Sequence, residues 1–342
     1  MKSKQILVIT ALMACIFTSC NNDDDNSGMQ QSSSTMLYAS NNSNGNITIY
    51  NVTDPVNITT KTLLTASTMA DGIYYDATED AVIQASRSEF ALEGFSNISD
   101  IVDNSPITID ISGTDDMESP REVAVSGNTY VVADNADVDG NTNTPDGRLF
   151  IYTKNGSSFN LRNTITTDFK LWGITFDGNG NLYAVVDATN ELAVFTNFLS
   201  NTADATLSAS KRIAIEAIVR THGIAYDAVA DVMVLTDIGA ASNGQDDGGF
   251  HIIENFSSKF NNVANGGTLE VSQQTRVSGA ATLMGNPVDV AYDAATKTVY
   301  IAEAGNNGGR ILAFNTIGSG GNIAPVVNNS LASASSVFLY KN

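Results

Sequence analysis

The chain has 342 residues and a formal net charge of −20, because 37 aspartate and glutamate residues outnumber 17 lysine and arginine residues. So acidic a surface repels phosphate backbones and no cluster of basic residues offsets it, so we expect no nucleic-acid binding. Both cysteines lie within the first 20 residues, which excludes disulfides, thiolate metal sites and cysteine nucleophiles from the rest of the chain.

The N-terminus has the pattern of a secretory signal. Lys2 and Lys4 precede the apolar run ILVITALMACIF, which is too short to span a bilayer. The TSCNNDDDN that follows resembles the processing site of a bacterial lipoprotein, where the cysteine after the cut is lipidated. We predict a signal peptide over residues 1–19, lipidation of Cys20 and an acidic, Ser-rich linker over residues 20–34. Cys15, with a leucine three residues before it, is the alternative lipidation site.

The acidic run Asp23-Asp24-Asp25 bears on where the protein resides. It resembles the export signal that follows the lipidated cysteine in Bacteroidetes-type lipoproteins. That resemblance implies a protein on the outer face of the outer membrane, held to the membrane by its lipid anchor. The alternative is a solvated spacer on a lipoprotein that faces the periplasm.

A repeated unit of about 50 residues occupies residues 35–342. Its alternating first strand, polar turn and second strand occur at 71–86, 120–134, 171–187, 221–237 and 287–303. Anchored on Gly72, Glu122, Gly173, Gly223 and Asp289, the units are 50, 51, 50 and 66 residues apart. Third strands are expected at 89–95, 148–152, 191–195, 250–254 and 310–314. Alternation with a period of two at this spacing predicts the blades of a β-propeller.

The chain ends supply a sixth unit. SSVFLYKN at 335–342 has the pattern of a first strand, and TMLYAS at 35–40 and GNITIYN at 45–51 have the patterns of a second and a third. We predict an all-β, six-bladed propeller closed by pairing of the N-terminal strands with the C-terminal strand, which removes open sheet edges. The Gly-aliphatic-x-aromatic-Asp opening of the unit and the hairpin NGNLYAVVDATNELAVF resemble NHL-type and SMP-30/gluconolactonase-type propellers. Such folds host enzymes, sensors and docking platforms, so this resemblance implies architecture more than function.

One face of such a propeller gathers the residues that enter first strands and those that end second strands. We call it the loop face. Its candidate binding residues are Arg87, Arg121, Trp172, Asp187, Asp237 and Glu303. Acids suit a cation, arginines suit a carboxylate, and a tryptophan suits a sugar ring or a protein partner. The structural alternative is that the acids cap backbone N–H groups, the arginines neutralise them and Trp172 packs between blades.

His222 and Glu122 are the candidate catalytic residues. His222, one of two histidines, stands at the entry to a first strand and could act as a general base or a ligand. The alternative is a polar residue satisfied locally. His251 lies within a third strand, and we expect it to be a residue of the sheet face. SMP-30-type hydrolases hold a divalent cation in the channel with a Glu, Asn and Asp set. The resemblance implies that Glu122 would take the glutamate part.

The loop at 134–147 is a candidate calcium site. Its acidic and amide residues at alternate positions resemble the opening of an EF-hand-like loop, and they are Asp137, Asp139, Asn141 and Asn143. The loop departs from that pattern at Thr142 and at Arg148, where the bidentate glutamate is missing. A solvated Asn/Gly loop is the alternative. Calcium or another divalent cation is the only cofactor that we expect.

Several enzymatic signatures are missing from the sequence. It contains no G-x-S-x-G elbow, no H-E-x-x-H pair and no P-loop. We predict a surface lipoprotein whose propeller binds a small molecule, a glycan or a protein without catalysis. A metal-dependent lactonase of the SMP-30 kind is the alternative, and an accessory subunit of an outer-membrane nutrient-uptake assembly is a further one.

Overall fold

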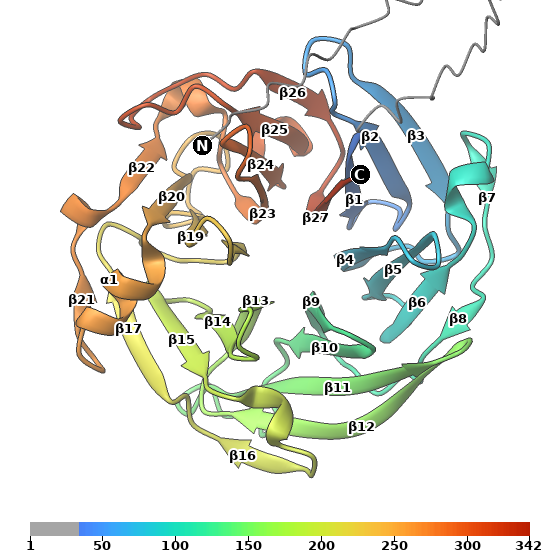
Figure 1. The fold of residues 1–342 in the computed structure, drawn as a ribbon, viewed down its shortest axis with the longest axis horizontal. Helices are drawn as coiled ribbons and strands as arrows, with labels where there is room; N and C mark the ends of the chain where they lie inside the picture. The colour runs from blue at the N-terminus through green and yellow to red at the C-terminus, as the bar shows by residue number, and fades with distance from the viewer. Residues whose placement is uncertain (1–33) are drawn as a thin grey trace, which may run out of the picture. The chain divides into compact units, whose positions relative to one another are not determined.

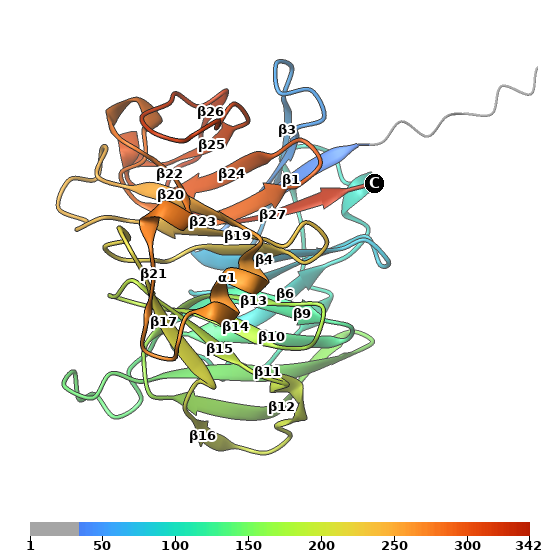
Figure 2. The same cartoon turned by 60° about the vertical axis from the view of Figure 1, so that its left-hand side comes forward.

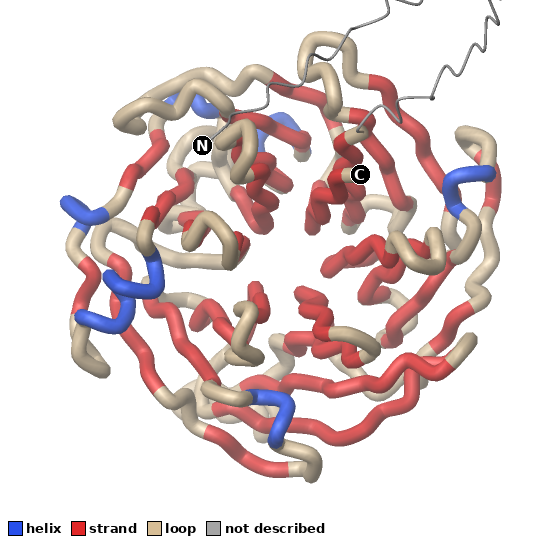
Figure 3. The backbone as a smooth tube through the Cα atoms, in the orientation of Figure 1, coloured by secondary structure: helices blue, strands red, loops and turns tan. Residues whose placement is uncertain are grey.

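The computed structural model describes residues 34–342, whose regular structure is mainly β-strand, with short helical segments at the periphery (Figure 3). The predicted signal peptide, both candidate lipidation cysteines and the linker up to residue 33 lie outside the described residues. Within residues 34–342, no helix is long and apolar enough to cross a membrane. The all-β prediction is confirmed.

The strands form mainly antiparallel sheets that radiate from a central axis (Figure 1). The first sheet has the order β27 (Ala334–Lys341), β1 (Thr35–Asn41), β2 (Ile47–Asn51), β3 (Thr59–Leu64) and β7 (Ser105–Pro106). The third has the order β13 (Leu171–Phe176), β14 (Leu182–Val186), β15 (Glu191–Phe195), β17 (Lys211–Ile215) and β21 (Thr268–Leu269). The fourth contains β18 (Ile224–Asp227), β19 (Val232–Asp237), β20 (Gly249–Glu254) and β22 (Thr275–Ser278). The fifth contains β23 (Pro287–Asp293), β24 (Thr298–Glu303), β25 (Arg310–Phe314) and β26 (Val327–Ser330).

The second sheet joins two antiparallel groups of strands. One group is β4 (Ala70–Asp76), β5 (Ala81–Ser86), β6 (Ala91–Phe95) and β8 (Ile111–Ser112). The other is β9 (Pro120–Ser126), β10 (Thr129–Asp134), β11 (Gly147–Asn155) and β12 (Ser158–Thr167), with β16 (Ala205–Leu207) pairing with β12. A single parallel pair, Ser112 with Ser158, connects the groups. The short helix α1 (Phe256–Asn262) follows β20.

The two ends of the described chain lie in one sheet (Figure 1). Strand β27 pairs antiparallel with β1, in a register that runs from Thr35–Lys341 to Asn41–Ala334. Strand β27 also contacts β23 on one side and β4 on the other. Around the axis, β27 thus lies between β23 and β4.

The hairpins follow the predicted pattern of an apolar strand ended by an aspartate turn. Asp177 accepts backbone N–H groups of the β13–β14 turn, and Asp227 does the same in the β18–β19 turn. Such turns replace the ladder bonds that a strand loses at its end. The predicted third strands at 191–195 and 310–314 coincide with β15 and β25.

The hydrophobic core lies between neighbouring sheets, which stack face to face (Figure 2). One cluster joins the β10–β12 strands to β13–β15, and includes Val131, Ile151 and Leu182. Another joins β1 and β2 to β24 and β25 through Leu37, Tyr50 and Tyr300. Burial of each large apolar side chain is worth about 1.5–3 kcal/mol, so these face-to-face contacts stabilise the packing of the sheets without disulfides.

Candidate functional site

A pocket of about 260 Å³ lies on the central axis, and six strands line it. They are the innermost strands of their groups: β4, β9, β13, β18, β23 and β27. Side chains alternate along a strand, so only every second residue of each strand points to the axis. The pocket is therefore built from equivalent positions of segments far apart in the sequence.

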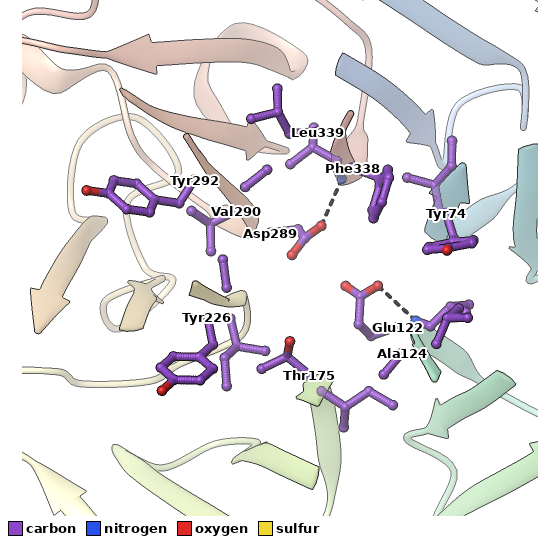
Figure 4. A pocket seen from close by; sticks show the side chains of 18 of the residues that line it. Tyr74, Glu122, Ala124, Thr175, Tyr226, Asp289, Val290, Tyr292, Phe338 and Leu339 are labelled. Atoms are coloured by element: carbon purple, nitrogen blue, oxygen red, sulfur yellow. Dashed lines mark hydrogen bonds between the residues drawn. The ribbon is translucent and has the colours of Figure 1, made fainter. Parts of the chain in front are cut away.

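Two carboxyl groups face each other across this pocket (Figure 4). Glu122 on β9 is 9% exposed and Asp289 on β23 is 4% exposed. Glu122 Oε1 accepts the backbone N–H of Val123 at 2.8 Å. Asp289 Oδ2 accepts Ser336 Oγ at 2.7 Å and the Val337 N–H at 2.8 Å, which ties β23 to β27. Asp289 also accepts from the Val290 N–H, and the two carboxyls hydrogen-bond to each other.

Burial dominates the electrostatics of the pair, because a buried carboxylate loses its hydration. It raises the pKa of Asp289 to about 7, against hydrogen bonds from β27 that favour the charged form. It also raises the pKa of Glu122 well above its usual value, and the neighbouring charge of Asp289 adds to that rise. At neutral pH the pair therefore carries fewer than two negative charges.

Glycines surround the pair at the same level of the channel. Gly72 and Gly173 occupy the positions in their strands that Glu122 and Asp289 occupy in theirs, and Gly223 has the equivalent position just before β18. A Cβ on Gly223 would lie 2.6 Å from Asp289 Cα, and one on Gly173 would lie 2.4 Å from the carbonyl oxygen of His222. Neighbouring backbones are in close contact here, at the level of the two acids.

The walls above the pair are unequal. Tyr74 and Phe338 lie side by side on one side of the pocket, with ring centroids 4.8 Å apart (Figure 4). Equivalent positions on the other four strands carry small side chains, namely Ala124, Thr175, Ala225 and Ala291. The pocket thus has an aromatic wall, an acidic end and room between small residues.

The loop-face residues Arg121, Trp172 and His222 form a stack. Each directly precedes the strand position that Glu122 or its equivalent glycine occupies. The Trp172 and His222 rings are 3.6 Å apart and nearly parallel, at 5°. The Arg121 guanidinium lies over the Trp172 ring at 4.3 Å. Both faces of the indole are therefore covered by protein groups, as the structural alternative for Trp172 requires. The role of Trp172 in binding stays a prediction.

Asp187 connects the stack to its surroundings. Its Oδ1 contacts His222 Nε2 at 3.1 Å and Arg220 Nη2 at 2.8 Å, and its Oδ2 accepts Asn135 Nδ2 at 3.0 Å. Burial alone would raise the pKa of Asp187, but hydrogen bonds from His222, Asn135 and Arg220 hold it well below its usual value. Asp187 is therefore charged at neutral pH.

Burial lowers the pKa of His222 to about 4, and the hydrogen bond with Asp187 offsets only part of that effect. His222 is thus neutral at pH 7 and donates from Nε2, which leaves Nδ1 as an acceptor. No donor reaches Nδ1 from the residues that the structure describes. A general-base role for His222 remains a prediction.

Asp71 pairs with two other loop-face residues. Arg121 Nη1 lies 3.1 Å from Asp71 Oδ2, and Arg87 Nε lies 3.6 Å from the same oxygen. The structure thus brings Arg87, Arg121, Trp172, Asp187 and His222 into one connected cluster. Arg87 and Arg121 neutralise Asp71 inside this cluster, as expected if their role is structural and not ligand binding.

Asp237 and Glu303 lie outside this cluster, at the ends of β19 and β24. Asp237 Oδ1 accepts the N–H groups of Val219, Arg220 and Gly239 at 3.0–3.1 Å. Glu303 Oε1 accepts N–H groups of Asn286, Gly305 and Asn306 at 2.7–2.9 Å. These are the capping contacts of the structural alternative. Their role in binding stays a prediction.

The loop at 134–147 brings three carboxylates together. Oxygens of Asp137, Asp139 and Asp146 lie within 4.8 Å of one another. Both oxygens of Asp137 are buried without a hydrogen-bond donor among the described residues, although Lys170 Nζ lies 3.9 Å from Oδ2. The side-chain oxygen of Asn141 instead accepts the N–H of Asn143, at 3.2 Å. Asp146 was not among the predicted ligands, because the alternate-position pattern ends before it.

Asp289, Tyr74 and Phe338 are pocket residues that the sequence analysis did not assign to a site. A signal for Asp289 exists in the repeat. Of the five anchors, three are glycines and the other two are carboxylic acids, Glu122 and Asp289. An acid where the backbone otherwise requires glycine marks a position that faces the axis.

We expect NMR to show that neither histidine titrates near pH 6.5. Burial lowers the pKa of both His222 and His251 to about 4, so their folded forms bind fewer protons than the unfolded chain between pH 4 and 6.5. Their contribution to stability is full above pH 6.5 and declines as the pH falls toward 4. Because the chain has only 2 histidines, imidazole ¹⁵N shifts resolve both, and His251→Gln assigns them. A midpoint near 6.5 in the folded protein would contradict the burial argument.

No protein-family model and no curated protein matches this chain. Several solved structures have a similar fold. A chain of a nidogen/laminin complex has 14% identity and a TM-score of 0.58, covering 90% of this chain and 98% of that chain. A protein of unknown function from Bacteroides caccae has 9% identity and a TM-score of 0.55, with 90% and 98% covered.

A putative 6-phosphogluconolactonase from Bacteroides fragilis NCTC 9343 has 13% identity and a TM-score of 0.56, covering 91% of this chain and 99% of that chain. Identities this low show the fold alone. The described residues form a β-propeller.

Proposed function

We propose that this β-propeller is a non-catalytic binding module whose ligand site is the central pocket at Glu122 and Asp289. The observation that carries the proposal is the pair of buried carboxyl groups facing each other across a pocket with unfilled volume. A buried polar pair is costly unless something compensates it, and a bound ligand is one source of compensation.

We also propose six blades, closed by β27 with β1. Six strands line the pocket and six hydrophobic clusters lie between successive groups of strands, which supports this count. The pairing of β27 with β1 supports closure through both chain ends.

Deletion of residues 334–342 is expected to abolish cooperative unfolding. It removes the partner of β1, two members of a core cluster and the donors to Asp289. Thermal melts followed by near-UV circular dichroism check this. Lys341→Ala, which removes only an ion pair with Asp293, is the control and should cost under about 1 kcal/mol. A truncated chain with the melting midpoint of the full chain would argue against closure.

The donor set of the pocket does not fit the lactonase alternative. Calcium takes six to eight oxygen ligands, and the described pocket offers two carboxyl groups. The equivalent positions on β4 and β13, and the one just before β18, are glycines, and the Ser336 hydroxyl already donates to Asp289. The pair therefore lacks the ligand set that a calcium-dependent lactonase requires.

The loop at 134–147 is a second candidate site, for a divalent cation. The convergence of Asp137, Asp139 and Asp146 favours it. Calcium is expected to raise the melting temperature of the native chain and not that of Asp137→Asn. The same shift in both proteins would exclude this loop as the cause.

We further propose that Cys20 anchors the propeller to the outer membrane with the propeller outside the cell. The acidic tract after Cys20 supports this location. Palmitate labelling that Cys20→Ala abolishes and Cys15→Ala retains tests the anchor. Protease treatment of intact cells distinguishes the outer face from the periplasmic alternative, and co-purification of a membrane partner would favour the accessory-subunit alternative.

Filling the pocket tests the proposed function. Thr175 lies half-buried on the pocket wall, so Thr175→Phe should occupy ligand space (Figure 4). Screening of cationic, neutral and anionic small molecules by thermal shift should find ligands whose affinity falls at least tenfold in this variant. Thr60→Phe, on the exposed outer strand β3, is the matched control and should bind like the native chain. If no ligand responds to Thr175→Phe while the variant stays folded, the pocket is not the site.

A further inference from the structure

The carboxyl pair has no cation of its own. Among the described residues, no lysine or arginine forms an ion pair with Glu122 or Asp289. Arg121, the nearest in sequence, turns instead to Asp71 and Trp172. Asp187 on the loop face, by contrast, forms an ion pair with Arg220. The pair thus forms the acidic end of the pocket and has no counterion among the described residues.

The carboxyl oxygens of the pair suit a donor-rich cation. Asp289 Oδ2 accepts from Ser336 and Val337, and Glu122 Oε1 accepts from Val123. Asp289 also accepts from the Val290 N–H, and the two carboxyls hydrogen-bond to each other, a bond that an incoming cation replaces. The two carboxyls approach the axis from opposite sides (Figure 4). A primary ammonium carries three N–H donors, so it can bond to both carboxylates and keep one donor for the Thr175 hydroxyl or water.

The rest of the pocket suits an organic group. The rings of Tyr74 and Phe338 form one wall, and aromatic rings attract cations and cover apolar surface. The alanines opposite leave space that a bare metal ion would not fill. An anion would meet two carboxyl groups and no basic side chain.

We infer that the ligand of the central pocket is a small organic ammonium compound, bound between Glu122 and Asp289 with its carbon skeleton against Tyr74 and Phe338. This inference rests on the proposed function and names its ligand class. Binding replaces protons on the pair by the ligand's positive charge. Affinity should therefore rise between pH 5 and pH 8, while the amine itself stays protonated.

Calorimetry with matched probes tests the inference on the full folded domain. The probes are butylamine and phenethylamine, their neutral analogues 1-butanol and 2-phenylethanol, the anion butyrate, and calcium chloride. Measurement at about 0.15 M salt screens non-specific attraction to the acidic surface. We expect the amines to bind and the alcohols and butyrate not to bind. Glu122→Gln and Asp289→Asn should each weaken amine binding at least tenfold, and Glu254→Gln, an exposed acid on β20, should not change it.

The outcomes separate the inference from the proposed function. If alcohols or butyrate bind and Thr175→Phe abolishes that binding, the pocket is the site but the ammonium inference is wrong. Amine binding that persists in both carboxyl variants also overturns the inference. Calcium binding that Glu122→Gln removes would replace the ammonium by a metal. If no probe and no screened compound responds to Thr175→Phe, the proposed function itself fails.

Discussion

Gly223→Ala is expected to destabilise the protein by about 3 kcal/mol, the upper range for overpacking a tight contact. The added Cβ would lie 2.6 Å from Asp289 Cα and 2.9 Å from Asp289 C. Both are backbone atoms of the neighbouring strand β23, so neither can rotate away. The expected fall in melting temperature is roughly 5 °C or more for a domain of this size. Equilibrium denaturation in urea measures the free energy of unfolding directly.

Gly178→Ala is the matched control, because its nearest neighbour would be Ala228 Cβ at 3.9 Å. We expect a change within about 0.5 kcal/mol there. Neither Gly223 nor Gly178 has a positive φ, so alanine strains the backbone at neither position. Equal effects of the two substitutions would show that the close backbone contact at Gly223 does not determine the stability of the protein.

Asp289→Asn is expected to stabilise the empty protein at pH 8 and to leave it unchanged near pH 4. Burial raises the pKa of Asp289 to about 7, so the folded form holds a proton that the unfolded chain has already lost above about pH 4. Stability therefore falls as the pH rises from about 4 to 7, and each unit of raised pKa costs about 1.4 kcal/mol. Asparagine removes that cost. Its Oδ1 still accepts from Ser336 and Val337, and its amide can donate to Glu122.

Urea denaturation at pH 5, 6, 7 and 8 checks this prediction. The advantage of the variant over the native chain should grow across the series and level off above pH 7. The depressed pKa values of the histidines give the opposite slope, so only the difference between the two proteins is informative. Glu254→Gln, which removes an exposed carboxylate, should show a difference close to zero at every pH. A difference for Asp289→Asn that is constant with pH would show that the raised pKa is not the cause.

Local patterns in the sequence predict most of the strands. The third-strand segments of the repeated unit identify β15 and β25 at their observed bounds, and aspartate turns mark the ends of β13 and β18. This works because side-chain alternation and turn geometry depend on neighbours within a few residues. The capping contacts of Asp237 and Glu303 could also be predicted, because a carboxylate after a strand commonly accepts nearby backbone N–H groups.

The candidate site was predicted only in part. Sequence position placed Glu122 on the axis, and put Arg121, Trp172 and His222 on one face. It did not reveal that Arg121 and His222 cover both faces of the indole, because that depends on side-chain directions across three strands. Asp146 was missed as a candidate ligand in the loop at 134–147, because loop conformation, and not spacing, brings it to Asp137.

The sequence by itself determined an all-β chain of repeated short strands, since that information is local and recurs in every unit. Only the tertiary structure decided that Glu122 meets Asp289 across a pocket with an aromatic wall. The physical reason is that burial sets the pKa of both carboxyls, and burial arises only when six distant strands converge on one axis.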